Sequence, residues 1–76
     1  MKSIKIALGL VQTVKEFVKI TETYPFEILL RSGKFSVDAK SLLGVLSLDL
    51  SEPLIVEVYA DDCDDLMLKL KKFEAK

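Results

Sequence analysis

The apolar residues of this chain change their spacing after Leu8, and this change limits the folds that the chain can form. Between Ser3 and Leu8 they alternate with small or polar residues, a period of two that predicts a strand with one buried face. From Leu10 to Thr21 they recur at the spacing of an amphipathic helix, which Pro25 must end. A strand that leads directly into such a helix favours a sheet covered by helices.

Two short β-prone runs, 26–30 and 35–38, follow the first helix. They flank the segment 31–34, in which Gly33 can adopt the positive φ that a hairpin turn needs. The sequence therefore predicts a β-hairpin in this region.

The second half of the chain again alternates helix, strand and helix. An apolar stretch over 40–48 predicts a short helix, which either Asp38 or Ser41 can cap. The β-branched run 54–59 predicts a strand. Asp61 then opens a helix whose apolar face is formed by Cys63, Leu66, Met67, Leu70 and Phe73.

This order, β-α-β-β-α-β-α, predicts an α+β fold. The simplest packing places the helices on one face of a four-stranded antiparallel sheet and leaves the other face open to solvent. Because the chain has 76 residues, it has room for one hydrophobic core, and we expect a single domain over 1–76.

Composition excludes several classes of function. The formal net charge is −1, and the basic residues form no stripe with interleaved aromatic residues, so we expect no nucleic-acid partner. No apolar run approaches the ~20 residues needed to span a bilayer, and the start has no signal-peptide core. A single cysteine agrees with a reducing compartment. We therefore expect a cytoplasmic protein without a membrane partner.

The side chains needed for catalysis are missing. The chain has no histidine, no glycine-rich phosphate loop and no base placed to activate a serine or threonine, so we expect neither an enzyme nor a cofactor. Acidic residues in a first helical turn offset the helix dipole, which accounts for the acidic run 61–65. The run does not have the spacing of a calcium loop. We expect no metal site there, and we expect Cys63 to be packed and inert.

The segment 37–48 reads Val-Asp-Ala-Lys-Ser-Leu-Leu-Gly-Val-Leu-Ser-Leu, and it resembles the most recognisable segment of the histidine-containing phosphocarrier (HPr) family. In that family this run forms the short second helix and carries a serine that a regulatory kinase phosphorylates. Ser41 takes that place. The element order, the Ser-Gly-Lys hairpin and the acidic start of the last helix are similar too. The resemblance covers nearly the whole chain and implies the HPr-like open-faced sandwich.

This chain does not match the other motif of the HPr family. In the family, a Gly-x-His-Ala-Arg-Pro-Ala segment joins the first strand to the first helix, and its histidine accepts the phosphoryl group from enzyme I. Here the loop contains Gly9, Leu10, Val11 and Gln12, and the place of the histidine falls at Leu10 or Gly9. Phosphohistidine chemistry needs an imidazole nitrogen, so the resemblance implies the fold of a carrier without its acceptor.

Ser41 has two interpretations that can hold together. A serine at a helix start accepts a backbone hydrogen bond, which needs no further function. By resemblance, Ser41 is also a candidate regulatory phosphorylation site, where the phosphate would lie beside Lys40 and at the favourable end of the helix dipole.

The short helix carries more leucine than one core can receive, so part of it is a candidate docking surface, formed by Lys40, Leu42, Leu43 and Leu46. Leu42 and Leu46 are four residues apart and share one helical face, whereas Leu43 is rotated away from them. We expect Leu42 and Leu46 to face the core and Leu43 to face outward.

The resemblance therefore implies an HPr-family protein of the bacterial sugar phosphotransferase system that acts through binding, as a regulatory variant. Its expected partners are proteins: an HPr kinase, enzyme I or a transcriptional regulator. The alternative is a small ligand-binding or oligomerisation module on the same fold, unrelated to phosphotransfer, in which Ser41 is only a cap.

Overall fold

The computed structural model describes residues 1–75 and confirms the order of elements. Its strands and helices alternate as the apolar spacing predicts. In chain order they are β1 (Lys2–Ile6), α1 (Val11–Glu22), β2 (Ile28–Ser32), β3 (Phe35–Asp38), α2 (Leu42–Leu46), β4 (Leu54–Val58) and α3 (Asp64–Leu70), which a 3-10 turn over Lys71–Phe73 extends.

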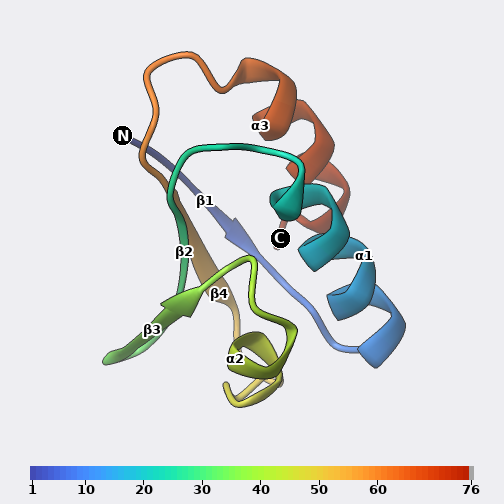
Figure 1. Cartoon of the computed structure of the whole chain (residues 1–76). Helices are drawn as coiled ribbons and strands as arrows, with labels where there is room; N and C mark the ends of the chain where they lie inside the picture. The colour runs from blue at the N-terminus through green and yellow to red at the C-terminus, as the bar shows by residue number, and fades with distance from the viewer. Residues whose placement is uncertain (76) are drawn as a thin grey trace.

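The strands form one four-stranded antiparallel sheet in the order β1-β4-β2-β3. The three helices lie on one side of this sheet, and its other side is open (Figure 1). The prediction of an open-faced α+β sandwich is therefore confirmed. No helix of residues 1–75 is long and apolar enough to cross a membrane.

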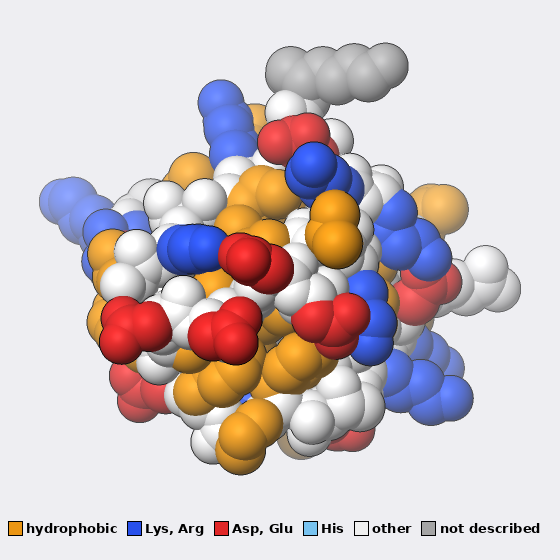
Figure 2. All heavy atoms as spheres, turned by 90° about the horizontal axis from the view of Figure 1, so that it is seen from above, with side chains coloured by type: hydrophobic (Ala, Val, Ile, Leu, Met, Phe, Trp, Pro, Cys, Tyr) orange, Lys and Arg blue, Asp and Glu red, His pale blue; other side chains and the backbone are white. Residues whose placement is uncertain are grey.

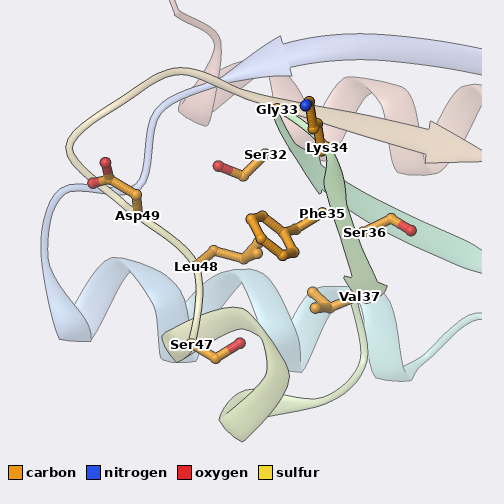
Figure 3. A pocket seen from close by; sticks show the side chains of 9 residues that line it. All are labelled: Ser32, Gly33, Lys34, Phe35, Ser36, Val37, Ser47, Leu48 and Asp49. Carbon is orange, nitrogen blue, oxygen red and sulfur yellow. The ribbon is translucent and has the colours of Figure 1, made fainter.

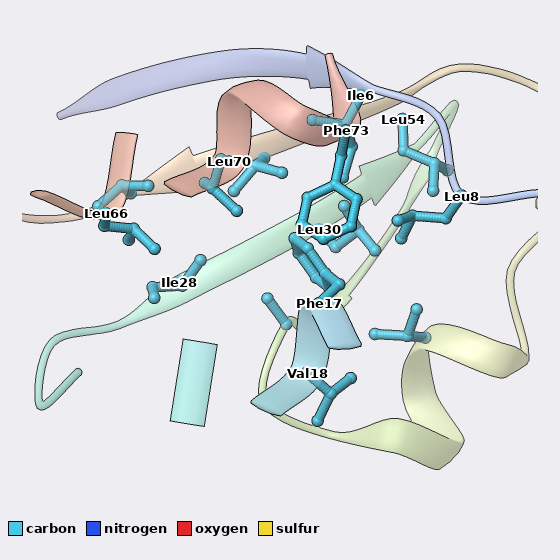
Figure 4. Packing of buried hydrophobic residues seen from close by; sticks show 14 of the residues in the cluster. Ile6, Leu8, Phe17, Val18, Ile28, Leu30, Leu54, Leu66, Leu70 and Phe73 are labelled. Atoms are coloured by element: carbon cyan, nitrogen blue, oxygen red, sulfur yellow. The ribbon is translucent and has the colours of Figure 1, made fainter. Parts of the chain in front are cut away.

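The core lies between the sheet and the helices (Figure 4). Phe17 of α1 is fully buried, and its ring meets the ring of Phe73 edge to face, with centroids 5.9 Å apart. Such aromatic pairs contribute about 0.5–1.5 kcal/mol beyond the burial of their area. Thr21, also buried, donates its hydroxyl to the carbonyl oxygen of Ala39 at 2.9 Å. This bond fastens α1 to the segment that precedes α2.

Three strands differ from their predicted bounds, the least being the strand predicted over 54–59, which ends at Val58. The strand predicted over 3–8 is the ladder Lys2–Ile6, because its partner β4 begins at Leu54, which pairs with Ile6. Leu8 is nevertheless fully buried, as its spacing predicts. The strand predicted over 26–30 is Ile28–Ser32, so that only Gly33 and Lys34 remain between β2 and β3.

Gly33 adopts a φ of 58°, as the hairpin requires. The hairpin turn is thus confirmed at Gly33, although it is tighter than the segment 31–34 suggested.

The last helix begins at Asp64 and not at Asp61, because Asp61 and Asp62 lie in the connection from β4. The second helix spans Leu42–Leu46 and is shorter than the predicted 40–48. Ser41 precedes it as the N-terminal cap. The backbone N–H of Ser47 bonds back to the carbonyl oxygens of Leu43 and Gly44, which closes the helix after little more than one turn.

Candidate functional site

The loop from β1 to α1, where the HPr family carries its acceptor, presents apolar side chains to solvent. Leu10 precedes α1 in an extended conformation, and no side chain caps the helix there. Leu10 is 67% exposed and Val11 is 56% exposed. Gly9 and Gln12 are exposed as well. A Cβ at Gly9 would meet no other atom within 4 Å, so lack of space does not explain this glycine.

None of these four residues offers a nitrogen that could accept and release a phosphoryl group. The only arginine of the chain, Arg31, lies on β2, where its guanidinium pairs with Glu57 at 3.2 Å. The loop therefore has neither an acceptor nor an arginine of its own that could bind phosphate.

The start of α2, in contrast, is held by side-chain hydrogen bonds. Ser41 has an extended backbone, and its Oγ accepts the backbone N–H of Gly44 at 3.1 Å. The carboxylate of Asp38 accepts the N–H of Lys40 at 2.9 Å, which fixes the turn before the helix. Of the two capping candidates, Ser41 caps the helix and Asp38 stabilises its approach.

Gly44 is closely packed at this cap. A Cβ at this position would lie 3.2 Å from Ser41 Oγ and 3.4 Å from Val37 Cβ. The serine and the glycine of the short helix therefore form one packed unit with the end of β3.

The inward residue of α2 is Val45, which is fully buried. The expectation that Leu46 faces the core is wrong, because Leu46 is 38% exposed. Leu42 is half-buried and lies three residues before Val45, so these two share the inward face of this short helix. Leu43 is 82% exposed and points outward, as predicted.

Lys40, the remaining docking candidate, is half-buried and directs its ammonium inward. Its Nζ donates a hydrogen bond to the carbonyl oxygen of Tyr24, just after α1, at 2.6 Å. This contact joins the end of α1 to the start of α2. Lys40 thus has a structural partner already, whereas Leu43 and Leu46 have exposed side chains.

The acidic residues at the start of α3 form contacts with other elements of the fold. Lys2 donates a hydrogen bond to Asp64 at 2.7 Å, and this contact lowers the pKa of the Asp64 carboxyl. The Tyr24 hydroxyl donates to Asp65 at 2.6 Å and, together with the charge of Lys69, lowers the pKa of Asp65. Figure 2, which looks onto the α3 end, shows acidic and basic side chains interspersed on this face.

Cys63 is buried, as predicted, with its thiol turned toward the carbonyl oxygen of Ala60. Within residues 1–75, no group of three His, Cys, Asp or Glu side chains is arranged to hold a metal ion.

Sequence reasoning missed the exposure of Leu10 and Val11 as an apolar surface, because the helical spacing assigned Leu10 to the buried face. Its position before the first helical turn was the available signal. It also missed Phe35, which is 72% exposed at the outer edge of the sheet.

Known structures and one family profile match this chain. The chain is similar to the crystal structure of HPr-C-His from Thermoanaerobacter tengcongensis, with a TM-score of 0.80 and 22% identity over 95% of this chain and 89% of that one. It is also similar to the phosphocarrier protein HPr from Bacillus anthracis strain Ames, with a TM-score of 0.73 and 17% identity over 97% and 94% of the two chains. No curated protein sequence matches.

At these identities the structures show the fold alone. The family profile described as "PTS HPr component phosphorylation site" matches residues 4–75, which is nearly the whole chain. This match is independent of the geometry described above. On that ground the chain belongs to the HPr family, the phosphocarrier family of the phosphotransferase system.

Proposed function

We propose that this protein is a non-carrier member of the HPr family that regulates the sugar phosphotransferase system by binding its proteins. The observation that carries the proposal is the replacement of the acceptor loop by exposed Leu10 and Val11, in a chain with no histidine. A protein that has the family fold but lacks the acceptor can still bind a partner protein at the site where a carrier docks. Such a role would be exercised in the cytoplasm.

The binding surface in this proposal consists of Leu10 and Val11 at the start of α1 together with Leu43 and Leu46 on α2. We call these four residues the α1–α2 apolar surface. The two helices pack against each other, and all four side chains are exposed. Leucine and valine side chains left in water on adjoining elements favour burial against a partner.

A shallow depression of about 220 Å³ lies between the same two helices. It is lined by Lys15, Val18, Lys19, Glu22 and Leu42. Two lysines beside an apolar floor suit a partner that offers apolar side chains flanked by carboxylates. We take enzyme I as this partner, because it is the protein that docks on the family's acceptor loop.

A titration of the isotope-labelled protein with enzyme I, followed by NMR, tests the proposal. We expect chemical-shift changes at the α1–α2 apolar surface and displacement of the protein by an authentic HPr. Leu43→Asp should weaken binding by about tenfold or more, as loss of a central apolar contact does. Leu68→Asp, on a 64% exposed leucine of α3, is the matched control and should bind normally. Equal weakening by both variants, or no binding by the protein itself, would refute this docking model.

We further propose that Ser41 is a regulatory phosphorylation site. Its Oγ is half-buried and already accepts the N–H of Gly44. A phosphate here would bring about −1.5 to −2 units of charge to the positive end of α2. This charge would stand beside the α1–α2 apolar surface, where it would alter the fit of a partner.

Incubation with an HPr serine kinase and ATP, read by mass spectrometry, tests this site. We expect one phosphoryl group on the protein and none on Ser41→Ala. Ser47 lies on the same short segment and is exposed, so Ser47→Ala is the control that should still be modified. Modification at any residue other than Ser41 would remove this part of the proposal.

A further inference from the structure

The two edges of the sheet differ in whether another segment of the chain pairs with them. At the end of β1, the C-terminal segment covers the edge over residues 5–7: Ala75 N–H donates to the carbonyl oxygen of Lys5 at 2.9 Å, and Ala7 N–H donates to that of Phe73 at 2.8 Å. Along β3, no other segment of residues 1–75 pairs with the outer side of the strand. Uncovered strand edges can pair with a further strand.

The register shows which backbone groups β3 leaves free. Ala39 N–H bonds to the carbonyl oxygen of Ile28 at 2.9 Å, and Val37 lies opposite Leu30 two residues earlier. Because hydrogen-bonded positions alternate in an antiparallel pair, Phe35 and Val37 direct their backbone groups toward β2. Lys34, Ser36 and Asp38 therefore direct theirs away from the sheet.

The sequence around Ser36 is complementary to itself when read in opposite directions. In an antiparallel pair of identical strands centred on Ser36, Lys34 lies opposite Asp38 and Phe35 lies opposite Val37. Each pairing occurs twice, as a two-fold axis requires. We propose that two copies of this chain associate through their β3 edges in this register, which extends the two sheets into one.

The charges on β3 favour pairing with a second copy of this strand over pairing with an unrelated strand. Lys34 and Asp38 are both exposed, and neither takes part in an ion pair among the described residues. The proposed register gives each lysine a carboxylate directly across the new ladder, where opposite charges are favourable. A register moved by one residue would lose both pairs and turn the apolar side chains to the wrong face.

The exposed apolar side chains of β3 also favour this pairing. Phe35 and Val37 project on the helix side of β3, beside a cleft of about 640 Å³ that also includes Leu48 (Figure 3). Phe35 is 72% exposed, which is unusual for a phenylalanine. In the proposed pair, the Phe35 ring of each copy lies against Val37 of the other, at the mouth of this cleft. The contact removes an exposed aromatic ring from water in both copies.

The contact area is small, because β3 has four residues. Interfaces of this class are weak and transient. The association should therefore appear at high protein concentration, and the monomer should dominate in dilute solution.

Cysteine cross-linking tests the register directly. Hydrogen-bonded antiparallel partners have Cα atoms about 5.5 Å apart, a distance that a disulfide can span. We expect Ser36→Cys to form a disulfide-linked dimer under mild oxidation at least about tenfold faster than Ser3→Cys. Ser3 is an exposed strand serine on β1 and controls for random collision, and the native Cys63 is buried. Equal rates for the two variants would overturn the proposal.

Sedimentation velocity over a concentration series tests the association without a cross-link. The N–H of Ser36 points away from β2, so Ser36→Pro should keep the fold while abolishing the dimer. Lys34→Glu should weaken the dimer at least about threefold, because like charges would then face each other. Lys5→Glu makes the same charge change at an exposed lysine of β1 and should have no effect. A chain that stays monomeric throughout, or a dimer that survives Ser36→Pro, would contradict the pairing.

Discussion

The start of α1 and the start of α2 differ in how the helix is capped. At α2, Ser41 caps the helix, Gly44 fits closely beneath the cap, and Val45 enters the core. At α1, Leu10 stands in the capping position with no side-chain hydrogen bond and faces solvent.

This difference follows from how each helix is held. α1 has twelve residues and buries Val14, Phe17, Val18 and Thr21, so it persists without a cap. α2 has five residues and buries only Val45, so it depends on its cap. The exposed, uncapped loop before α1 is therefore compatible with the fold. At α2, Ser41 has two roles: it caps the helix, and it is the candidate phosphorylation site.

The largest effect in this comparison should come from Val45→Ala. The substitution removes a fully buried side chain from a short helix and should lower the free energy of unfolding by about 2 kcal/mol. Leu43→Ala, on the exposed face of the same helix, should cost less than about 0.5 kcal/mol. Urea denaturation of both variants gives the comparison. Losses of equal size would mean that α2 is buried all round, and its docking role would fall.

The next effect should come from Ser41→Ala. Removing the hydroxyl leaves the Gly44 N–H without its partner and should cost about 1 kcal/mol, as loss of an N-cap does. Ser3→Ala, at an exposed strand position, controls for the loss of a hydroxyl. If Ser41→Ala is as stable as this control, the Ser41 cap has no role in folding, and Ser41 would have to be explained by phosphorylation alone.

A smaller effect of opposite sign should come from Leu10→Asp. Leu10 has φ −123° and ψ 147°, which is the backbone that capping residues adopt, and α1 has no acidic residue in its first turn. An aspartate here should cap the helix, favour its dipole and stabilise the protein by about 0.5–1 kcal/mol. Leu10→Ala should bring no such gain. A destabilised Leu10→Asp variant would show that the leucine contributes packing that its exposure does not reveal.

The sequence predicted the order of the elements and the side of the sheet that the helices cover, because both depend on apolar spacing over many residues. It failed at Leu46, because a helix of little more than one turn has too few residues to define a face. It also failed at Asp61, since any of several consecutive acidic residues could have opened the last helix. The free edge of β3 depends on strand order, which periodicity does not encode.

The smallest effect should come from restoring the acceptor alone. Leu10→His supplies an imidazole nitrogen, but the loop has no arginine, and Arg31 is held by Glu57 on the sheet. Without donors that position the phosphoryl group, we expect phosphotransfer far below that of an authentic HPr. A transfer assay with enzyme I and phosphoenolpyruvate measures this. Near-normal transfer by Leu10→His would mean that the rest of the loop matters little.

The same assay on the unaltered protein tests the central claim, that an HPr fold persists here without carrier chemistry. The protein is incubated with enzyme I and phosphoenolpyruvate, beside an authentic HPr as positive control, and its intact mass is measured under conditions that preserve acid-labile phosphate. We predict that the mass of this protein stays unchanged while that of the control rises by one phosphoryl group. A stoichiometric gain of one phosphoryl group by this protein would contradict the account.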